Sequence, residues 1–184
     1  MSAAGPAWVD EVLQFWFGQC DERAWFTRDA AFDAQLRERF GALHARLVDG
    51  LEPVPGTGEG LLAAVIVLDQ FSRNLHRGEA RAFAGDARAR ALASEAIARG
   101  LDAGWPAARR LFLALPFEHS EDLADQDRAV ALVAALGNPQ WLRYAQAHRD
   151  LIARFGRFPH RNAVLGREST DAERAAMAGP MGKF

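Results

Sequence analysis

The chain has 184 residues, of which 49% are hydrophobic and 25% charged, and its formal net charge is -2 at pH 7. This length suits a single domain, here residues 1–184, with enough apolar residues for a hydrophobic core. The composition is that of a globular protein, and the small net charge excludes the broadly basic surface typical of nucleic-acid-binding proteins.

The single cysteine, Cys20, excludes a disulfide framework and a cysteine zinc site. The first residues, MSAAGPAWVDE, lack the basic and apolar regions of a secretory signal. The most apolar run, from Leu61 to Leu68, is far shorter than the about 20 residues that a membrane-spanning helix needs. We therefore expect a cytoplasmic protein with neither a membrane nor a nucleic acid as its partner.

Apolar residues recur at helical spacing almost throughout the chain, and no stretch alternates as a strand does, which predicts an all-α fold. The first helix is predicted over residues 6–17, ended by Gly18, and the second over residues 29–48. The loop 52–60, EPVPGTGEG, separates them from a third helix at 59–75. The first half of this third helix is apolar on every side, so we expect it to be central.

The remaining helices are predicted from their caps and stop signals. Their ranges are 86–98, then 106–115 ended by Pro116, 120–136 capped by Ser120, 138–155 opened by Asn138 and Pro139, and a short helix begun by the capping box of Thr170 and Glu173. Seven or eight helices with short connections predict stacked antiparallel pairs, as in a bundle or an α-solenoid. The sequence has no clean internal period, so a tetratricopeptide-like architecture is expected only in structure.

Three polar segments interrupt the apolar pattern. The first is LDQFSRNLHRG, residues 68–78, which places Asp69 one helical turn before Arg73 and puts Gln70, Arg73 and Arg77 on a common stripe. One interpretation is an ion pair of Asp69 and Arg73 within the helix that neutralises itself. The other is a binding site that also includes Asn74.

The second polar segment is LPFEHSEDLADQ, residues 115–126. His119 and Glu121 lie at the predicted entrance to a helix, where free backbone N–H groups favour anions. Helix capping explains the acidic residues but not His119, which is either structural or a general base, a hydrogen-bonding anchor or a metal ligand. The spacing of His119 and Glu121 is only a fragment of a metal motif, so neither a metal nor a cofactor is predicted.

The third segment, RFGRFPHRNAVLGREST at residues 154–170, places Arg157, His160, Arg161 and Asn162 among aromatic residues. Charged groups near apolar side chains are costly unless they are paired or bound, which indicates a site or a buried polar network. Arginine forks bind carboxylates and phosphates at two points, which favours an acidic ligand. Alternatively, these arginines bind acidic residues of the protein and hold the C-terminal segment in place, the candidates being Asp69, Glu118, Glu121 and Asp122.

These three motifs, with VLQFWFG near the start of the chain and WF at Trp25 and Phe26, closely resemble a bacterial family catalogued as domain of unknown function 924. The resemblance spans nearly the whole chain. It implies an all-α fold of tetratricopeptide-like helix pairs, in agreement with the apolar periodicity. It implies no activity, so no catalytic role is carried over.

Three hypotheses follow. In the first, the protein binds a small acidic ligand or a peptide carboxylate through Asp69, Gln70, Arg73, Asn74, Arg77, His119, Arg157, His160, Arg161 and Asn162. In the second, it is an enzyme of hydrolase or lyase type, in which His119 or His160 acts as acid or base on an anionic substrate and Asp69 or Glu121 orients it. In the third, the polar segments form a purely structural network.

Overall fold

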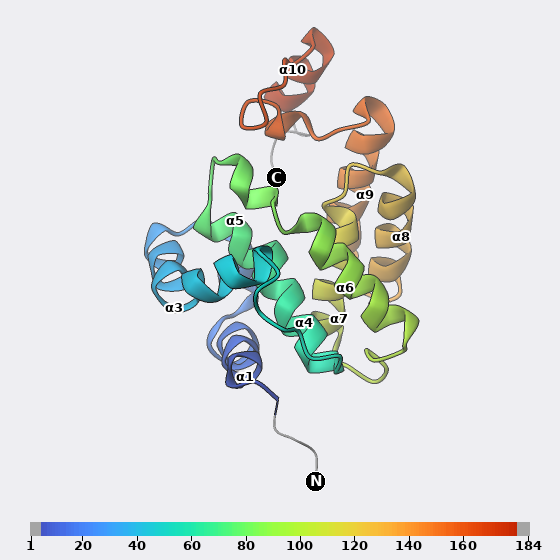
Figure 1. The fold of residues 1–184 in the computed structure, drawn as a ribbon. Helices are drawn as coiled ribbons and strands as arrows, with labels where there is room; N and C mark the ends of the chain where they lie inside the picture. The colour runs from blue at the N-terminus through green and yellow to red at the C-terminus, as the bar shows by residue number, and fades with distance from the viewer. Residues whose placement is uncertain (1–4, 180–184) are drawn as a thin grey trace. The chain divides into compact units, whose positions relative to one another are not determined.

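The computed structural model describes residues 5–179, and within this range the regular structure is entirely helical, which confirms the predicted all-α fold (Figure 1). Whereas the sequence predicts one domain, the residue contacts group the chain into two compact units. Unit 1 comprises the residues up to Arg77 and Arg81–Leu113, and unit 2 comprises Gly78–Ala80 and the residues from Ala114 onward. Helix α7 (Ala107–Glu118) therefore begins in unit 1 and ends in unit 2.

Unit 1 begins with α1 (Ala7–Gln14), which continues directly into a π-helical turn, Phe15–Gln19. The sequence predicts that Gly18 ends this helix. Gly18 instead lies inside the π-helical turn, and the helix continues to Gln19 before the backbone becomes extended. A glycine in a helix is unfavourable but tolerated, so it is not a certain stop signal.

The next two helices both begin at an aspartate cap. Asp21 caps α2 (Glu22–Phe26), a helix that the sequence does not predict because five residues are too few to show a helical period. Asp29 accepts two backbone N–H hydrogen bonds at the start of α3 (Ala30–Val48), which matches the predicted second helix.

The third predicted helix is central to unit 1, as expected. It consists of α4 (Gly58–Val65), a π-helical segment Ile66–Phe71, and α5 (Ser72–Leu75) in direct succession. This helix contacts α1, α3 and α6, and every residue from Leu61 to Leu68 is buried. Burial on all sides explains why its sequence lacks a polar face.

Helix α6 (Asp86–Ala98) has the predicted range, and its first turn packs closely against the π-helical segment. Gly85 permits this approach, because a Cβ atom at that position would lie only 2.5 Å from the carbonyl oxygen of Leu68. Aromatic side chains fill the core of unit 1, where the ring of Trp16 contacts those of Phe71 and Phe112 at centroid distances of 5.3 and 5.5 Å.

In unit 2, α8 (Leu123–Ala134) and α9 (Pro139–Phe155) lie side by side and antiparallel, joined by a short turn (Figure 1). The predicted opening of α9 is confirmed, since the Asn138 side chain accepts hydrogen bonds from two backbone N–H groups of its first turn. Gly156, with a φ of 68°, ends α9 in a left-handed conformation.

A turn of 3-10 helix, Pro159–Arg161, leads from α9 toward α10 (Asp171–Ala178). The predicted capping box of α10 is confirmed in both directions. The backbone N–H of Glu173 donates to the Thr170 hydroxyl at 3.2 Å, and the backbone N–H of Thr170 donates to Glu173 Oε2 at 2.7 Å.

The prediction that Pro116 ends a helix is wrong, because Pro116 lies within α7. Pro116 removes the N–H that would bond the carbonyl oxygen four residues earlier, and the helix continues for two residues beyond it. The last carbonyl groups of any helix also lack donors from within the helix. Gln126 is fully buried and donates its side-chain amide to the carbonyl oxygens of Glu118 at 2.6 Å and Ser120 at 2.7 Å. The end of α7 is therefore stabilised by a side chain from α8.

The predicted cap of α8 is also wrong by two residues. Asp122, not Ser120, accepts the backbone N–H groups of Ala124 at 2.8 Å and Asp125 at 3.1 Å. The Ser120 hydroxyl instead donates to the carboxylate of Asp125 at 2.7 Å. Aspartate and serine are comparable caps, so the choice depends on where the backbone turns.

Candidate functional site

The first polar segment forms an ion-pair cluster within unit 1. Asp69 is only 1% exposed, and its carboxylate accepts a hydrogen bond from Gln70 at 2.6 Å and pairs with Arg73 at 3.1 Å. Arg73 also donates a hydrogen bond from each of its two terminal guanidinium nitrogens to the carboxylate of Asp86, at the start of α6, at 3.0 and 3.1 Å. The two carboxylates outweigh burial and raise the pKa of Arg73 above its already high usual value.

Asn74 and Arg77 point to a different partner, Asp33 on α3. Asn74 donates to Asp33 Oδ1 at 2.7 Å, and Arg77 donates to both carboxylate oxygens at 2.5 and 3.0 Å. Although burial opposes the charged form, the hydrogen bonds from Arg77 and Asn74 lower the pKa of Asp33. This part of the segment therefore ties α5 to α3.

The second and third polar segments meet inside unit 2. Glu121 accepts the backbone N–H of Phe158 at 2.7 Å and a two-point hydrogen bond from Arg167 at 2.7 and 2.9 Å. Burial works against ionisation here, but the hydrogen bonds from Arg167 and Phe158 are stronger and lower the pKa of Glu121. Glu121 is thus an ionised anchor for the segment that follows α9.

Glu173 anchors the same segment from its other side. Arg157 donates to both of its oxygens, at 2.6 and 2.9 Å, and Asn162 donates to Oε2 at 3.3 Å. With the backbone N–H of Thr170 also donating, these hydrogen bonds, led by that from Arg157, lower the pKa of Glu173 to about 2. Arg157 and Asn162 therefore serve the folding of the C-terminal segment.

Two imidazole rings and one guanidinium lie against the buried ring of Phe158, and a third imidazole ring lies next to one of these two. The ring centroids of His148 and His160 lie 5.6 and 5.4 Å from that of Phe158, and His119 lies 6.2 Å from His148. The guanidinium of Arg161 stacks over Phe158 at 4.6 Å and donates to the carbonyl oxygen of His119 at 3.0 Å. Hereafter His119, His148, His160 and Arg161 are called the imidazole cluster.

His148 belongs to this cluster, although the sequence does not single it out as a site residue. Its Nδ1 atom lies 2.9 Å from the carbonyl oxygen of Tyr144 and 3.1 Å from Glu118 Oε1. Burial, with the nearby charges of His119, His160 and Arg161, lowers the pKa of His148 to about 3. The only sequence signal for this arrangement is a histidine on the buried side of an amphipathic helix.

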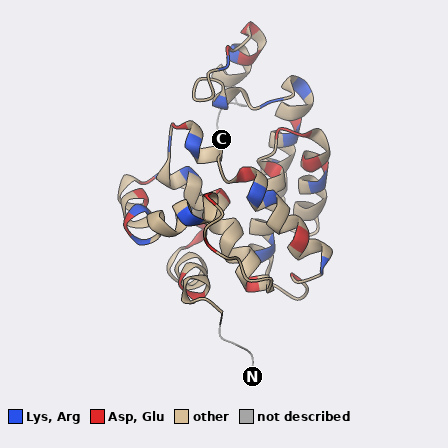
Figure 2. Ribbon diagram, viewed as in Figure 1, with Lys and Arg blue, Asp and Glu red and all other residues tan. Residues whose placement is uncertain are grey.

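The structure therefore divides the predicted site residues between the two units. Unit 1 brings together Asp69, Gln70 and Arg73 in one cluster and Asn74 and Arg77 in another. Unit 2 brings together His119, Glu121, Arg157, His160, Arg161 and Asn162. In both units acidic and basic residues are interspersed along the helices, in keeping with the small net charge (Figure 2).

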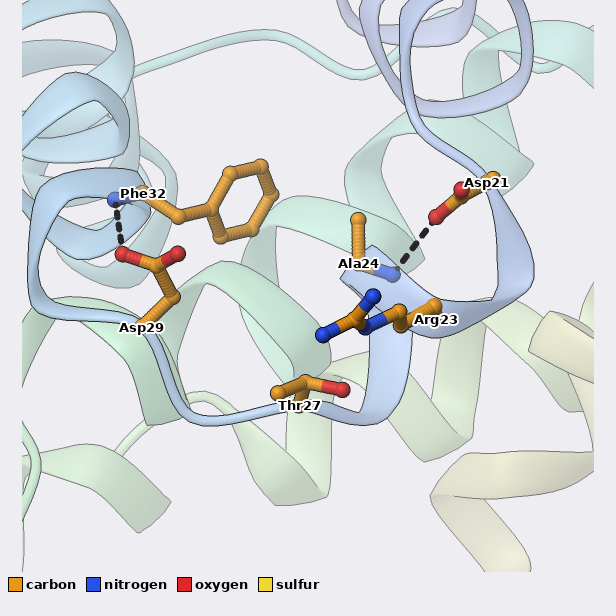
Figure 3. Close-up of a pocket in the computed structure, with 6 residues that line it drawn as sticks. All are labelled: Asp21, Arg23, Ala24, Thr27, Asp29 and Phe32. Carbon is orange, nitrogen blue, oxygen red and sulfur yellow. Dashed lines mark hydrogen bonds between the residues drawn. The ribbon is translucent and has the colours of Figure 1, made fainter.

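A hollow of about 210 Å³ lies elsewhere in unit 1, between α2 and the start of α3 (Figure 3). Its lining residues are Asp21, Arg23, Ala24, Thr27, Asp29 and Phe32. Both aspartates are engaged as helix caps, as the dashed lines of Figure 3 show. None of the predicted site residues lines this hollow.

The described residues hold neither a group of metal ligands nor a membrane-spanning helix. Between residues 5 and 179, no three His, Cys, Asp or Glu side chains are grouped as ligands for a metal ion. Over the same residues, no helix combines the length and the apolar character required to span a bilayer.

Comparison with known proteins gives a consistent result. A sequence model described as "bacterial protein of unknown function (DUF924)" matches residues 12–181, which include all three polar segments. A solved structure of a protein of unknown function from Agrobacterium tumefaciens is 40% identical, has a TM-score of 0.83, and covers 93% of this chain and 97% of its own. A search of curated proteins gives no significant match.

Proposed function

The chain belongs to the bacterial protein family of unknown function DUF924, and from this premise we propose that it binds a small acidic ligand at the imidazole cluster of unit 2. The observation that carries the proposal is the grouping of two imidazole rings and one guanidinium around Phe158, with a third imidazole ring, that of His119, beside His148. These groups come from three separate parts of the chain, namely the end of α7, the middle of α9 and the turn before α10.

The chemistry of the cluster suits a carboxylate or a phosphate. A guanidinium and imidazole N–H groups are hydrogen-bond donors, and their bonds to an anion are charge-assisted when the donor is protonated. His160 is exposed and His119 is half-buried, so a small molecule can reach this part of unit 2 from solvent. Phe158 is a fully buried apolar side chain beside these groups. Apolar surroundings have a low dielectric constant, which strengthens electrostatic interactions next to them.

Other arginines of the polar segments bind carboxylates of the protein itself. Arg77, Arg157 and Arg167 each direct two guanidinium nitrogens at one protein carboxylate. A two-point bond of this kind is the same contact that a ligand carboxylate would require. We therefore propose that these three arginines stabilise the fold and do not bind the ligand. For these residues the proposal agrees with the hypothesis of a purely structural network.

The hypothesis that the protein is an enzyme with a histidine as acid or base has weaker support. It requires Glu121 or Asp69 to orient a catalytic histidine. Glu121 accepts hydrogen bonds from Arg167 and the backbone of Phe158, and Asp69 accepts them from Gln70 and pairs with Arg73. Binding therefore requires fewer assumptions than catalysis, and a peptide carboxylate is a special case of the same ligand chemistry.

The test is a thermal-unfolding screen of the purified chain against acetate, succinate, malate and inorganic phosphate. A ligand that binds only the folded state raises the midpoint temperature of unfolding. At a ligand concentration of a hundred times its Kd, the free energy of unfolding increases by about 2.7 kcal/mol. We expect at least one of these acids to raise the midpoint of the wild type. We expect His160→Ala, which alters an exposed side chain, to weaken that ligand about tenfold through loss of one hydrogen bond.

Arg161→Gln provides the stronger test, with Arg99→Gln as its matched control. Both variants remove one guanidinium, but Arg99 lies at the exposed end of α6 and pairs with Glu95. The expected result is loss of the ligand-induced shift in Arg161→Gln alone, in protein whose circular dichroism shows a folded chain. Equal shifts in the wild type, His160→Ala and Arg161→Gln would refute the proposed site.

A further inference from the structure

The hollow between α2 and the start of α3 is lined by side chains of both charges (Figure 3). Asp21 and Asp29 each carry a negative charge there, and Arg23 carries a positive one. The ring of Phe32 adds an aromatic surface, and it stacks on the buried ring of Phe15 at a centroid distance of 5.9 Å. The hollow thus combines fixed charges of opposite sign with an apolar wall that the core of unit 1 supports.

Arg23 differs from Arg73 and Arg77 of the same unit, which bind carboxylates of the protein. Within the described range, 5–179, the Arg23 guanidinium has neither an ion pair nor a hydrogen bond. In Figure 3 it lies between the side chains of Asp21 and Asp29, and no dashed line joins it to either. Its N–H groups can therefore bind a molecule in the hollow.

The two aspartates each retain an acceptor oxygen that faces no donor in the described part of the chain. Oδ1 of Asp21 accepts the backbone N–H of Ala24, and Oδ1 of Asp29 accepts those of Ala31 and Phe32. Each cap uses only that one oxygen of its carboxylate. The hollow thus offers acceptors for a cation as well as donors for an anion.

The charges of the lining decide which ligands fit. A simple anion is attracted by Arg23 but repelled by Asp21 and Asp29, and a simple cation meets the opposite forces. A molecule with separate positive and negative groups is attracted at both ends. The volume of about 210 Å³ is smaller than the about 300 to 1,000 Å³ of pockets for drug-sized ligands, which favours a small metabolite.

We propose that this hollow binds a free α-amino acid in its zwitterionic form. The carboxylate of the amino acid accepts a two-point hydrogen bond from Arg23. Its ammonium group donates to the second oxygen of Asp21 or Asp29, and its aliphatic side chain packs against Phe32. The site shares no residue with the imidazole cluster and lies in the other unit, so this proposal and the proposed function fail or succeed separately.

Binding is measured by titrating glycine, L-alanine and L-valine into 15N-labelled protein at pH 7 and recording 1H–15N spectra. We expect at least one of them to shift the amide resonances of residues 21–32. The matching amide lacks the carboxylate, and the matching deaminated acid lacks the ammonium group; for L-alanine these are L-alaninamide and propionate. We expect each analogue to bind about tenfold more weakly, the effect of losing one charge-assisted hydrogen bond.

Two variants assign the charges of the ligand to residues of the hollow. Arg23→Gln should weaken binding of the amino acid about tenfold, because it removes the partner of the carboxylate. The matched control is Arg28→Gln, since Arg28 is an exposed arginine of the same stretch that does not line the hollow. We expect this control to bind the amino acid as the wild type does.

The second variant combines Asp21→Asn with Asp29→Asn. Asparagine caps helices as well as aspartate does, so both caps are retained while both negative charges are lost. We expect the double variant to unfold at the same temperature as the wild type and to bind the amino acid about tenfold more weakly. Asp122→Asn, at the cap of α8, makes the same change outside the hollow and should not affect binding.

Three results would overturn the proposal. One is that none of the three amino acids shifts the resonances of residues 21–32. Another is that the amino acid and its two analogues bind equally well. The third is that Arg23→Gln and the double aspartate variant both bind the amino acid as tightly as the wild type.

Discussion

Glu121 shows how one ionised side chain organises a segment that has little regular structure. Its carboxylate accepts hydrogen bonds from Arg167 and from the backbone N–H of Phe158, so it fixes two points of the chain between α9 and α10. Phe158 is fully buried against Leu151 and Ile152 of α9. The anchor and the apolar contact together determine where the groups on either side of Phe158 lie.

We therefore predict that Glu121→Gln destabilises the protein by about 1 to 3 kcal/mol, the usual cost of leaving buried hydrogen-bonding groups unmatched. Local loosening should accompany it, because glutamine has one acceptor oxygen where glutamate has two, so that Arg167 and the amide of Phe158 compete for it. Hydrogen exchange measures both effects, and the amide of Phe158 should exchange faster relative to those of α8.

Asp127→Asn is the matched control in the same unit. It removes one carboxylate from an exposed ion pair with Arg149, a contact that should contribute less than about 1 kcal/mol. If Glu121→Gln and Asp127→Asn have equal effects on stability and on Phe158 exchange, Glu121 is not an anchor.

The sequence alone indicates which side chains need partners but not which partners they have. Arginines among aromatic residues predict ion pairs or a ligand, and ion pairs are found. The partner of Arg77 is Asp33, 44 residues earlier, and that of Arg167 is Glu121, 46 residues earlier. Pairings at this separation depend on how helices pack, which no local pattern encodes.

Among the helical segments, the π-helical segment Ile66–Phe71 is the one whose packing leaves least room for change. It is buried, it carries Asp69 and Gln70, and the backbone at Gly85 approaches its Leu68 carbonyl closely. π-Helical turns are uncommon and arise where a helix accommodates an additional residue. The close contact with Gly85 lets Asp86 reach Arg73 in the ion-pair cluster.

Gly85→Ala should therefore destabilise unit 1 by about 1 to 3 kcal/mol, because the new methyl group would lie 2.5 Å from a backbone oxygen and the backbone must shift. Gly41→Ala is the control, since its added Cβ meets only Arg37 Cγ at 3.9 Å within α3. There we expect stabilisation of up to about 1 kcal/mol from improved helix propensity. Urea-unfolding midpoints compare the two, and a neutral Gly85→Ala would contradict this packing.

Helix boundaries were predictable where one local signal decides them. The Asn138 cap and the capping box of Thr170 with Glu173 form as expected, since each uses atoms within three residues. Ser120 was a wrong prediction because Asp122 competes for the same role nearby. The prediction at Pro116 is wrong for a different reason: α7 accommodates the loss of one backbone N–H and continues for two residues, and its last carbonyl groups accept hydrogen bonds from Gln126 of the next helix.

For the whole molecule, each unit contains a histidine that burial keeps neutral. His44 on α3 contacts the Ser72 hydroxyl at 2.5 Å, and burial, with the charges of His76 and Arg81, lowers its pKa to about 4. His148 in unit 2 has a pKa of about 3. An unfolded histidine titrates near 6.5, so the unfolded chain binds protons that the folded chain excludes.

Stability should consequently be highest above pH 6.5 and should fall as the pH decreases from 6.5 toward 4, before the carboxylates protonate. With a pKa unit equivalent to about 1.4 kcal/mol, we expect a loss of about 2 kcal/mol from each histidine, or about 4 kcal/mol in all, between pH 7.5 and 5. Urea unfolding at a series of pH values measures it. His44→Gln retains a polar contact for Ser72 but does not titrate, so its stability should depend less on pH than that of the wild type.

The helix that belongs to both units has a consequence for synthesis on the ribosome. A nascent chain that ends at Leu113 already contains all the residues of unit 1, but only the first half of α7, with the buried Leu111 and Phe112 at its growing end. We expect unit 1 to collapse around Phe112 first, since chains fold from the end that emerges first. The rest of α7 would then elongate from a formed turn, and unit 2 would start its folding on a helix that unit 1 has already nucleated.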